Sequence, residues 1–516
     1  HALQRILKET QDTVVTASIG LPYRMNGKVR SCIALVFAGR VLAVVPSGSD
    51  KAPFGFLPRL DYDPIRKPPL TPVSKLLLRF GNELFDDSPE PHAGSVLLAP
   101  GALNCTGVSF ERLTATVSDY SARSGCAVVY ASPNPGESSS FHLFDGVCAI
   151  AAHGNIIAVS EPFSVDPFVY ADVDISELTP YEPFNQPEKA LGQTFLSVDP
   201  ETLKTQCARL LTMQAAALER RLSHIGGKGF VVGVSGGLDS ALALLAAAAG
   251  ADRLQLSRKS VLGVSMPGLG TTTRTKLNAR ELVEALGCNY REIDIKGACK
   301  RHFEDIGHDI SVHDTVFENV QARERTKILL SLSNKYDLLD IGTGDLSELA
   351  LGWTTFCGDH MSQYAINSSL PKTVIRLMVK EAMERFPDAA DVLRRILDTP
   401  VSPELLPSAD GEITQKTEET LGAYELHDFF LYCLLVYGDS PIKIYQKAKK
   451  FLPYDEKEII RVLGIFLKRF FRSQFKRNSG TEGPNLLVSL SPSAFDMPSD
   501  RNSQSRCLMS FTCQAT

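Results

Sequence analysis

Hydrophobic and polar positions follow two different periods along the chain. Between residues 31 and 174, short apolar runs are bounded by Gly, Pro, Asn and Ser, as in CIALVFAGRVLAVVP, SVLLAP, CAVVYAS, FDGVCAIAAHGNIIAVS and FVYADVDIS. Their β-branched and aromatic content predicts strands. Apolar residues three and four positions apart in PVSKLLLRFGNELF and FERLTATVSDYSARSG predict helices between them. This half is therefore expected to be α/β or α+β.

The second half alternates strand and helix patterns. It follows a connector at residues 179–194 that contains Pro and Glu but has no apolar period. An amphipathic helix ends at Gly226-Gly227, and the strand-like runs GFVVGVSGG, SVLGVSMPG, NYREIDI and LLDIGTG come next, each beside a helical pattern. This alternation predicts a parallel sheet with both faces covered. Residues 371–477 are mainly helical in pattern.

These patterns predict two domains and a tail. The first domain is expected over residues 1–190 and the second over 191–478. Residues 479–516 are rich in Ser, Pro and Asn and are expected to be poorly ordered.

The composition excludes several classes of protein. Of 516 residues, 44% are hydrophobic and 22% charged, which rules out a disordered chain, a collagen-like repeat and a coiled-coil rod. With 54 basic and 59 acidic side chains the net charge is −5, so no overall positive field recruits nucleic acid or an anionic membrane. Eleven scattered cysteines without a C-x-x-C pair indicate reduced thiols in a cytoplasmic enzyme. The longest apolar run, ALALLAAAAG, is too short to span a bilayer, so a soluble protein is expected.

Residues 230–250, FVVGVSGGLDSALALLAAAAG, predict a phosphate site. A β-branched strand leads through SGGLDS directly into an Ala-rich helix. Glycines permit close backbone approach, and the start of a helix presents unpaired N–H groups and the positive end of its dipole. Asp239 in such a loop indicates Mg²⁺ between its carboxylate and the phosphates. Leu238 follows the glycines where a kinase-like P-loop has Lys, and the plain alternative is a tight turn with an Asp/Ser N-cap.

The loop resembles the pyrophosphate loop of ATP pyrophosphatases, which cleave ATP between the α and β phosphates to adenylate a substrate. Blocks further along the chain narrow this resemblance to NAD synthetase. They occur in the order of that family between about residues 210 and 477: MPGLGTTT from Met266, FENVQARER from Phe317, GTGDLSELALGW from Gly342, CGD from Cys357, PKT from Pro371, SPEL from Ser402 and QFKR from Gln474.

The resemblance implies a reaction and a set of roles. The nicotinate carboxylate of deamido-NAD becomes an acyl-adenylate at the expense of ATP, and ammonia then displaces AMP. The catalytic residues that it implies are Ser235, Asp239 and Glu348, and the last two are the Mg²⁺ ligands. The ATP-binding positions are Gly233, Val234, Ser235, Gly236, Gly237, Leu238, Asp239, Ser240, Thr343, Lys372 and Ser402. The deamido-NAD-binding positions are Arg323, Glu348, Trp353, Asp359 and Lys476.

Each of these residues also fits a structural role when it is taken alone. Arg323 fits a solvated helix face, and Glu348 fits dipole stabilisation in a first helical turn. Trp353, the only Trp, fits a core position, and Lys476 fits a helix C-terminus. Only the joint order of the motifs favours the functional interpretation.

The first half resembles the nitrilase-like amidase domain of glutamine-dependent NAD synthetases, in which a Cys, a Glu and a Lys hydrolyse glutamine. Aligned position by position, Gly81 stands at the nucleophile and Ser47 at the lysine, with Lys51 nearby. The position of the Glu lies upstream of His1, a start that suggests a cut chain. Cys105 and the other nearby cysteines fall outside the nucleophile position. The expectation is a truncated amidase half without glutaminase activity.

The expected fold class is α/β, with a C-terminal doubly wound parallel sheet of the adenine nucleotide alpha hydrolase type and an incomplete N-terminal nitrilase-like α-β-β-α sandwich. The expected ligands are ATP, Mg²⁺, deamido-NAD, and ammonia or glutamine, in a chain that forms homo-oligomers. Two alternatives remain open. One is a functional glutamine-hydrolysing NAD synthetase, and the other is an inactive nucleotide-binding pseudoenzyme subunit.

Overall fold

The structure, a computed structural model, forms two compact units. Unit 1 comprises residues 1–104, 109–137 and 144–190, and unit 2 comprises residues 105–108, 138–143 and 191–516. The residues that the structure describes are 2–13, 16–25, 28–46, 77–80, 95–101, 105–140, 142–164, 168–174, 177–178, 195–399, 420–491, 495, 497 and 499. The expected connector at residues 179–194 lies outside this described part.

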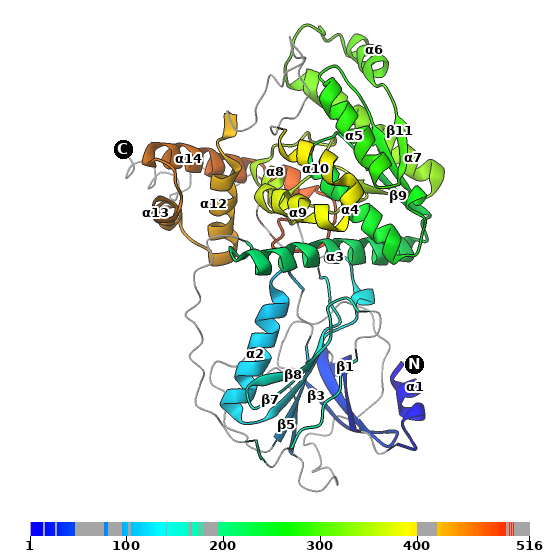
Figure 1. Ribbon diagram of the computed structural model, residues 1–516, viewed down its shortest axis with the longest axis vertical. Helices are drawn as coiled ribbons and strands as arrows, with labels where there is room; N and C mark the ends of the chain where they lie inside the picture. Colours follow the sequence, from blue (N-terminus) through cyan, green and yellow to red (C-terminus); the bar gives the residue numbers. More distant parts are fainter. Residues whose placement is uncertain are drawn as a thin grey trace. The chain divides into compact units, whose positions relative to one another are not determined.

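Unit 1 contains a three-stranded antiparallel sheet and a five-stranded mixed sheet (Figure 1). The first has the order β1-β2-β3, with strands Thr16–Met25, Lys28–Phe37 and Arg40–Pro46, and helix α1, Ala2–Glu9, precedes it. The second has the order β4-β5-β6-β7-β8, with strands Leu77–Phe80, Ser95–Pro100, Ala127–Ala131, Cys148–Ala152 and Asn155–Val159. Its first three strands are parallel, and β6, β7 and β8 are antiparallel.

The core of unit 1 lies between the five-stranded sheet and helix α2, Ser109–Ser124. Leu113, Val117 and Tyr120 of α2 follow the helical period and pack on Val128 and Ala149 of the sheet. The helix that the sequence predicts here is thus confirmed. A short 3₁₀ turn, η2, covers Pro135–Glu137.

Two local predictions in unit 1 are wrong. Leu77–Phe80, expected within a helix, form β4, because pairing with β5 outweighs the local apolar period. Residues 168–174, expected as a strand, have no regular structure, and Phe168 and Tyr170 are exposed. Apolar content alone does not supply a neighbouring strand to pair with.

Unit 2 is built on a five-stranded parallel sheet in the order β11-β10-β9-β12-β13. The strands are β9 Gly229–Gly233, β10 Val261–Ser265, β11 Asn289–Glu292, β12 Leu338–Gly342 and β13 Tyr364–Ala365. The helices are α3 Pro200–Ile225, α4 Leu238–Arg253, α5 Thr273–Ala285, α6 Lys296–Ile306, α7 Thr315–Tyr336, α8 Leu346–Leu351, α9 Lys372–Arg385, α10 Ala390–Leu397, α12 Tyr424–Tyr437, α13 Pro441–Phe451, α14 Glu456–Arg472 and α15 Gln474–Asn478. The 3₁₀ turns are η4 Arg258–Ser260 and η5 Pro387–Ala389.

Helices cover both faces of this sheet. On β9, Val231 packs with Phe317 and Leu332 of α7, whereas the ring of Phe230 faces Gly250 of α4. Because successive strand residues point to opposite faces, α4 and α7 lie on opposite sides of the sheet. The expected α/β class with a doubly wound parallel sheet is confirmed.

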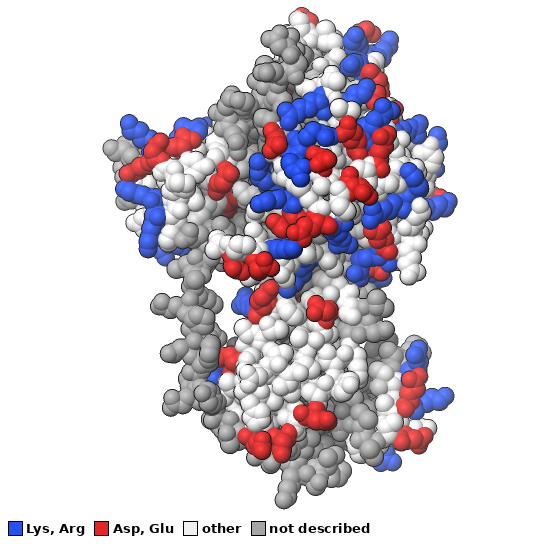
Figure 2. Space-filling view, viewed as in Figure 1, with Lys and Arg blue, Asp and Glu red and all other residues white. Residues whose placement is uncertain are grey.

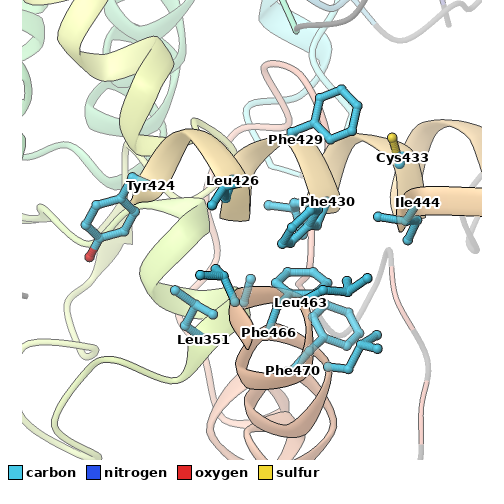
Figure 3. Packing of buried hydrophobic residues seen from close by; sticks show 14 of the residues in the cluster. Leu351, Tyr424, Leu426, Phe429, Phe430, Cys433, Ile444, Leu463, Phe466 and Phe470 are labelled. Atoms are coloured by element: carbon cyan, nitrogen blue, oxygen red, sulfur yellow. The ribbon is translucent and has the colours of Figure 1, made fainter. Parts of the chain in front are cut away.

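A helical subdomain of α8, α12, α13 and α14 completes unit 2 around a second apolar core. Figure 3 shows Phe430 of α12 directed toward Leu463, Phe466 and Phe470 of α14. The rings of Phe430 and Phe466 meet edge to face at 5.8 Å. This packing confirms the mainly helical pattern expected after residue 371.

The segment that follows α15 corrects the expectation of a tail with poor order from residue 479. Residues 479–491 are packed in unit 2, where Leu486 and Leu490 are buried. The amide of Ala365 donates to the carbonyl of Glu482, and the amide of Leu486 donates to Oγ of Ser369. The polar composition therefore conceals two buried leucines and specific backbone bonds.

Lys and Arg alternate with Asp and Glu over the visible face of unit 2 (Figure 2). Oppositely charged side chains of unit 2 form surface ion pairs, such as Arg258 with Asp252 at 2.7 Å. Exposed pairs of this kind contribute little individually to stability. In the described part of the chain, no helix is both long and apolar enough to cross a bilayer.

Candidate functional site

The candidate site lies where the strand order of the parallel sheet reverses. β10 and β11 continue to one side of β9, and β12 and β13 lie on its other side. In such sheets the loops after two neighbouring strands separate and leave a crevice beyond their carboxyl ends. A cavity of about 290 Å³ occupies this place, between the end of β9 at Gly233 and the end of β12 at Gly342.

Most of the site residues predicted from sequence line this cavity. They are Gly233, Val234, Ser235, Gly237, Leu238, Asp239, Ser240, Thr343, Glu348, Trp353 and Asp359. Gly236 and Lys372 are not in the lining, but Gly236 lies within the loop and Lys372 contacts Asp239 and Glu348, which line the cavity. The positions of Arg323 and Lys476 are described below. Ser402, Ser47, Gly81 and Lys51 lie outside the described residues.

Gly236 gives the β9–α4 loop its shape. Its φ is +83°, a conformation that side-chain-bearing residues rarely adopt. A Cβ at this position would also lie far inside contact distance of the carbonyl oxygen of Thr275. The loop thus packs closely against α5, and no larger residue fits at residue 236 without displacing one of them.

The loop presents hydroxyl and amide groups at the start of α4. Ser235 Oγ lies 3.1 Å from Ser240 Oγ and accepts a hydrogen bond from the amide of Gly237 at 3.2 Å. Ser240 Oγ donates to the carbonyl of Gly237 at 3.0 Å. Gly237 is the N-cap of α4 and has no side chain to satisfy the first helical N–H groups. Those groups and the helix dipole suit a phosphate.

Four charged groups meet beside the cavity, and two of them, Asp239 and Glu348, line it. The Lys372 ammonium lies 2.7 Å from Asp239 Oδ2, 2.5 Å from Asp345 Oδ2 and 3.0 Å from Glu348 Oε1. Asp239 is on α4, Asp345 and Glu348 begin α8, and Lys372 begins α9. The fold therefore brings three helix starts together, and we call these four residues the acid–lysine cluster.

Local structure explains how the acid–lysine cluster is held. Asp345 is the N-cap of α8 and accepts a hydrogen bond from the amide of Glu348 at 2.8 Å. Pro371 precedes Lys372 as the N-cap of α9. The cap satisfies the α8 backbone with one carboxylate oxygen of Asp345 and leaves the other facing Lys372.

Burial and charge shift the pKa values in this cluster. Burial, followed by the neighbouring Glu348 charge, raises the pKa of Asp345 well above its usual range. Burial raises the pKa of Glu348 to about 7, although Lys372 opposes this effect. Burial lowers the pKa of Lys372, but its three carboxylate neighbours outweigh burial and raise it well above its usual value. Part of the rise at Asp345 and Glu348 comes from repulsion between neighbouring carboxylates, and a bound cation would relieve that repulsion.

The donor set fits a hard divalent cation. In the described part of the chain, Asp239, Asp345 and Glu348 offer carboxylate oxygens that lie within 4.8 Å of one another. Asp239 Oδ1 is buried and accepts no hydrogen bond. Carboxylate oxygens near a phosphate site are the ligands that Mg²⁺ prefers. Asp345 therefore adds a third acid to the two metal ligands expected from sequence.

Asn367 links the two loops that border the cavity. Its amide nitrogen donates to the carbonyl of Asp239 at 3.0 Å and to the carbonyl of Thr343 at 3.2 Å. Its amide oxygen accepts from Nε2 of Gln214 on α3 at 2.9 Å. Asn367 is fully buried, and its side chain is committed to these contacts.

Of the residues expected at the deamido-NAD positions, some line the cavity and others do not. Trp353 and Asp359 line the cavity, with the guanidinium of Arg469 4.7 Å above the Trp353 ring. Lys476 donates to the carbonyls of Gly352 at 2.8 Å and Thr354 at 2.5 Å, so it braces the backbone around Trp353.

Helix α7 presents one arginine to the surface and another to the cavity. Arg323 is exposed on α7 and donates to the carbonyl of Phe356 at 3.2 Å. Arg325, two residues further on, lines the cavity and donates to the carbonyl of Met266. Sequence reasoning assigned the site position to the first of these residues only.

Asp340 is a further cavity residue that sequence reasoning missed. It lies on β12, is 1% exposed and lines the cavity, and burial raises its pKa to about 7. Its backbone amide donates to Gln363 Oε1 at 2.9 Å, whereas its own Oδ1 accepts no hydrogen bond. The sequence signal that could have identified Asp340 is a single acid inside an otherwise apolar strand, LLDIG.

The comparisons with known proteins show the family of this chain. The sequence model described as NAD synthase matches residues 210–479, just over half of the chain, including the loop and the acid–lysine cluster. This chain belongs to the NAD synthase family. A glutamine-dependent NAD(+) synthetase of Mycobacterium bovis is 31% identical over 94% of this chain and 84% of its own length.

Two further comparisons set the extent of the likeness. A glutamine-dependent NAD(+) synthetase of Mycobacterium leprae is 36% identical over 70% of this NAD synthase family member, which spans 62% of the length of that relative. The crystal structure of a glutamine-dependent NAD(+) synthetase from Cytophaga hutchinsonii superposes with a TM-score of 0.73 at 18% identity, covering 99% of this chain and 89% of that chain. The shared fold thus includes the amino-terminal half.

Proposed function

We propose that this chain converts deamido-NAD into NAD with ATP and ammonia. The observation that carries the proposal is that the loop at residues 235–240 lines the same cavity as Glu348 of the acid–lysine cluster, where the strand order of the sheet reverses. Lys372 lies against Asp239 of the loop and against Glu348. A phosphate site and a group of acids with a lysine are what an adenylating enzyme requires. Membership of the NAD synthase family supports this assignment.

The proposed reaction has two steps. In the first, an oxygen of the nicotinate carboxylate attacks the α-phosphorus of ATP, the bond to the bridging oxygen breaks, and pyrophosphate leaves. In the second, the nitrogen of ammonia attacks the acyl carbon and loses a proton, and AMP leaves with the electrons of the acyl–oxygen bond. The protein has to position two anionic substrates and offset charge that develops on phosphate oxygens.

The described residues divide these tasks. The amides at the start of α4 and the hydroxyls of Ser235 and Ser240 are proposed to hold the ATP phosphates. Lys372 supplies positive charge next to them. Asp239, Asp345 and Glu348 would hold Mg²⁺, which supplies electrostatic stabilisation of the phosphate oxygens when it is bound. Thr343 is proposed as a further ATP contact.

Deamido-NAD is proposed to bind on the side of Trp353 and Asp359, since both line the cavity. Lys476 then acts indirectly, because it holds the backbone on both sides of Trp353. Arg323 remains a proposed contact at the exposed surface of α7.

The source of nitrogen is the open part of the proposal. The relatives named above are glutamine-dependent enzymes. The resemblance described from the sequence puts Gly81 at the nucleophile and Ser47 at the lysine of the amidase half, and neither residue could do that chemistry. Free ammonia is therefore the proposed donor. Among the other thiols, burial and the nearby Asp145 raise the pKa of Cys148, which is the opposite of what a nucleophile needs.

The test compares nitrogen donors. Purified chain with ATP, Mg²⁺ and deamido-NAD is expected to form NAD and AMP with ammonium, and far less with glutamine. Full turnover with glutamine alone would show that the amidase half is active. In that case, alkylation followed by peptide mapping would identify the thiol that glutaminase activity needs.

The pseudoenzyme alternative predicts a different result. Neither AMP nor pyrophosphate would form with every substrate supplied, although ATP would still bind. The intact loop and the acid–lysine cluster favour catalysis over that alternative. We further propose a homo-oligomer, which light scattering of the purified chain would test.

A further inference from the structure

Asp428 is a buried acid on α12 that contacts the starts of two other helices. It is 3% exposed. Its Oδ1 accepts a hydrogen bond from Ser347 Oγ at 2.5 Å. Its Oδ2 accepts from the amide and the hydroxyl of Thr373 at 2.9 and 2.7 Å. Both carboxylate oxygens thus accept hydrogen bonds.

The partners of Asp428 are the chain neighbours of the acid–lysine cluster. Ser347 precedes Glu348 on α8, and Thr373 follows Lys372 on α9. Ser347 Oγ also accepts a hydrogen bond from the backbone amide of Lys372 at 2.9 Å. A continuous set of hydrogen bonds therefore joins α12 to Ser347, next to Glu348, and to the backbone of Lys372 and Thr373.

We propose that Asp428 is a positioning residue for the reaction, which sets the separation of Glu348 and Lys372 through Ser347 and Thr373. The inference rests on the proposed function, and it goes beyond it in assigning a role to the helical subdomain. Asp428 acts without contact to ATP or deamido-NAD.

The chemistry of the contacts explains why an acid is needed. A carboxylate accepts hydrogen bonds on both oxygens, whereas an asparagine in the same place offers one oxygen and one NH₂ group. If the NH₂ group faces Thr373 it meets the Thr373 amide, which is itself a donor. If it faces Ser347, the Ser347 hydroxyl no longer donates to residue 428 and has to accept a second hydrogen bond beside that of the Lys372 amide. Burial raises the pKa of Asp428 to about 6. The three donors act in the opposite direction, because they stabilise the buried charge.

The opposite side of α12 has a different task. Phe430, two residues further on, points into the apolar core against Phe466, as Figure 3 shows. A substitution there weakens the packing of the same helix without removing a hydrogen bond to α8 or α9. Phe430→Leu is therefore a matched control for loss of stability.

The experiment measures steady-state kinetics and thermal unfolding of four variants of the full chain. Asp428→Asn and Ser347→Ala are each expected to lower kcat about tenfold or more, since small displacements of reacting groups have large effects on rate. The KM for deamido-NAD should change less than threefold, roughly the limit of an indirect effect. The double variant should lose no more than the stronger single variant, because the two residues belong to one connection. Phe430→Leu should lower the melting temperature at least as much as Asp428→Asn and leave kcat within about twofold.

Three outcomes would overturn the proposal. They are a folded Asp428→Asn with the kcat of the unmodified chain, additive losses in the double variant, and an equal loss of kcat in Phe430→Leu. Should Asp428→Asn fail to fold, Ser347→Ala and Thr373→Val test the same connection. If the unmodified chain binds ATP with Mg²⁺ by calorimetry but makes no NAD, the proposed function fails instead. The positioning role is then read from a weaker binding of ATP with Mg²⁺ by Asp428→Asn than by Phe430→Leu.

Discussion

The amide nitrogen of Asn367 lies 3.0 Å from the carbonyl oxygen of Asp239, so a buried side chain after β13 holds the backbone at the start of α4. The same nitrogen reaches the carbonyl of Thr343 after β12. The spacing of the two loops that border the cavity thus depends on one residue outside both of them.

Asn367→Ala tests this relationship. Removal of the amide takes a buried donor from two carbonyls and one of two acceptors from Gln214 Nε2, so the free energy of unfolding should fall by about 2 kcal/mol or more. NAD formation should fall more than the loss of folded protein accounts for. Urea unfolding and initial rates measure the two effects. Ser368→Ala, which removes a half-buried hydroxyl next to it, should change both only slightly, and equal effects of the two substitutions would contradict this role.

Gly236→Ala should damage ATP binding more than stability. The new methyl group meets the carbonyl of Thr275, and its relief displaces the loop that presents Ser235 and the α4 amides. We expect the affinity for ATP with Mg²⁺ to fall at least tenfold, about 1.4 kcal/mol, by calorimetry.

Gly287→Ala is the control for Gly236→Ala. Gly287 also has a positive φ, +71°, but a Cβ there meets nothing within 4 Å. The Gly287→Ala variant should lower the unfolding free energy by about 1 kcal/mol through backbone strain alone and leave the affinity for ATP unchanged. An equal loss of affinity in both variants would show that the contact with Thr275 is unimportant.

Asp345→Asn should change the requirement for Mg²⁺. Asparagine still caps α8, but the acid–lysine cluster loses one of its three carboxylates. The Mg²⁺ concentration for half-maximal rate is expected to rise about tenfold, with a smaller change in the rate at saturating Mg²⁺. Metal titrations after chelator treatment measure this shift. The exposed Asp391→Asn should leave the titration unchanged, and an unaltered Mg²⁺ requirement in Asp345→Asn would remove this residue from the metal site.

Asp340→Asn should alter the pH dependence of stability. Burial raises the pKa of Asp340 to about 7, against about 3.9 in an unfolded chain. Between these values the folded protein binds more protons than the unfolded chain, so the carboxyl lowers the unfolding free energy as the pH rises, by up to about 1.4 kcal/mol per pH unit. Asparagine removes this slope. The melting temperature of the variant, relative to the unmodified chain, should therefore rise between pH 4 and pH 7 and stay level above.

The exposed Asp337 supplies the control for this prediction. Asp337→Asn breaks an ion pair with Lys228 at the surface and should change the melting temperature only slightly, without the rise expected for Asp340→Asn. A difference between Asp340→Asn and the unmodified chain that is independent of pH would show that Asp340 is not buried as an acid.

Local sequence accounts for most of the C-terminal fold. The strand before Ser235, the Ala-rich helix after Ser240 and the glycine stop after α3 are all formed as predicted, because each depends on neighbours within a few residues. The errors lie where pairing at a distance decides. Leu77–Phe80 became a strand because β5 lies beside it, and residues 168–174 stayed irregular.

The candidate site follows the same division. The sequence by itself determined the loop, Asp239, Glu348 and their order, since short motifs specify the backbone turn and the chemistry of their own side chains. Only the tertiary structure decided that Asp345 joins them, that Arg325 reaches the cavity where Arg323 stays at the surface, and that Lys476 braces the backbone. Asn367 and Asp428 acquire roles only because β13 and α12 fold against the loops of the site. The physical reason is that hydrogen bonds and ion pairs between distant segments depend on how sheets and helices pack, and no periodicity along the chain records that packing.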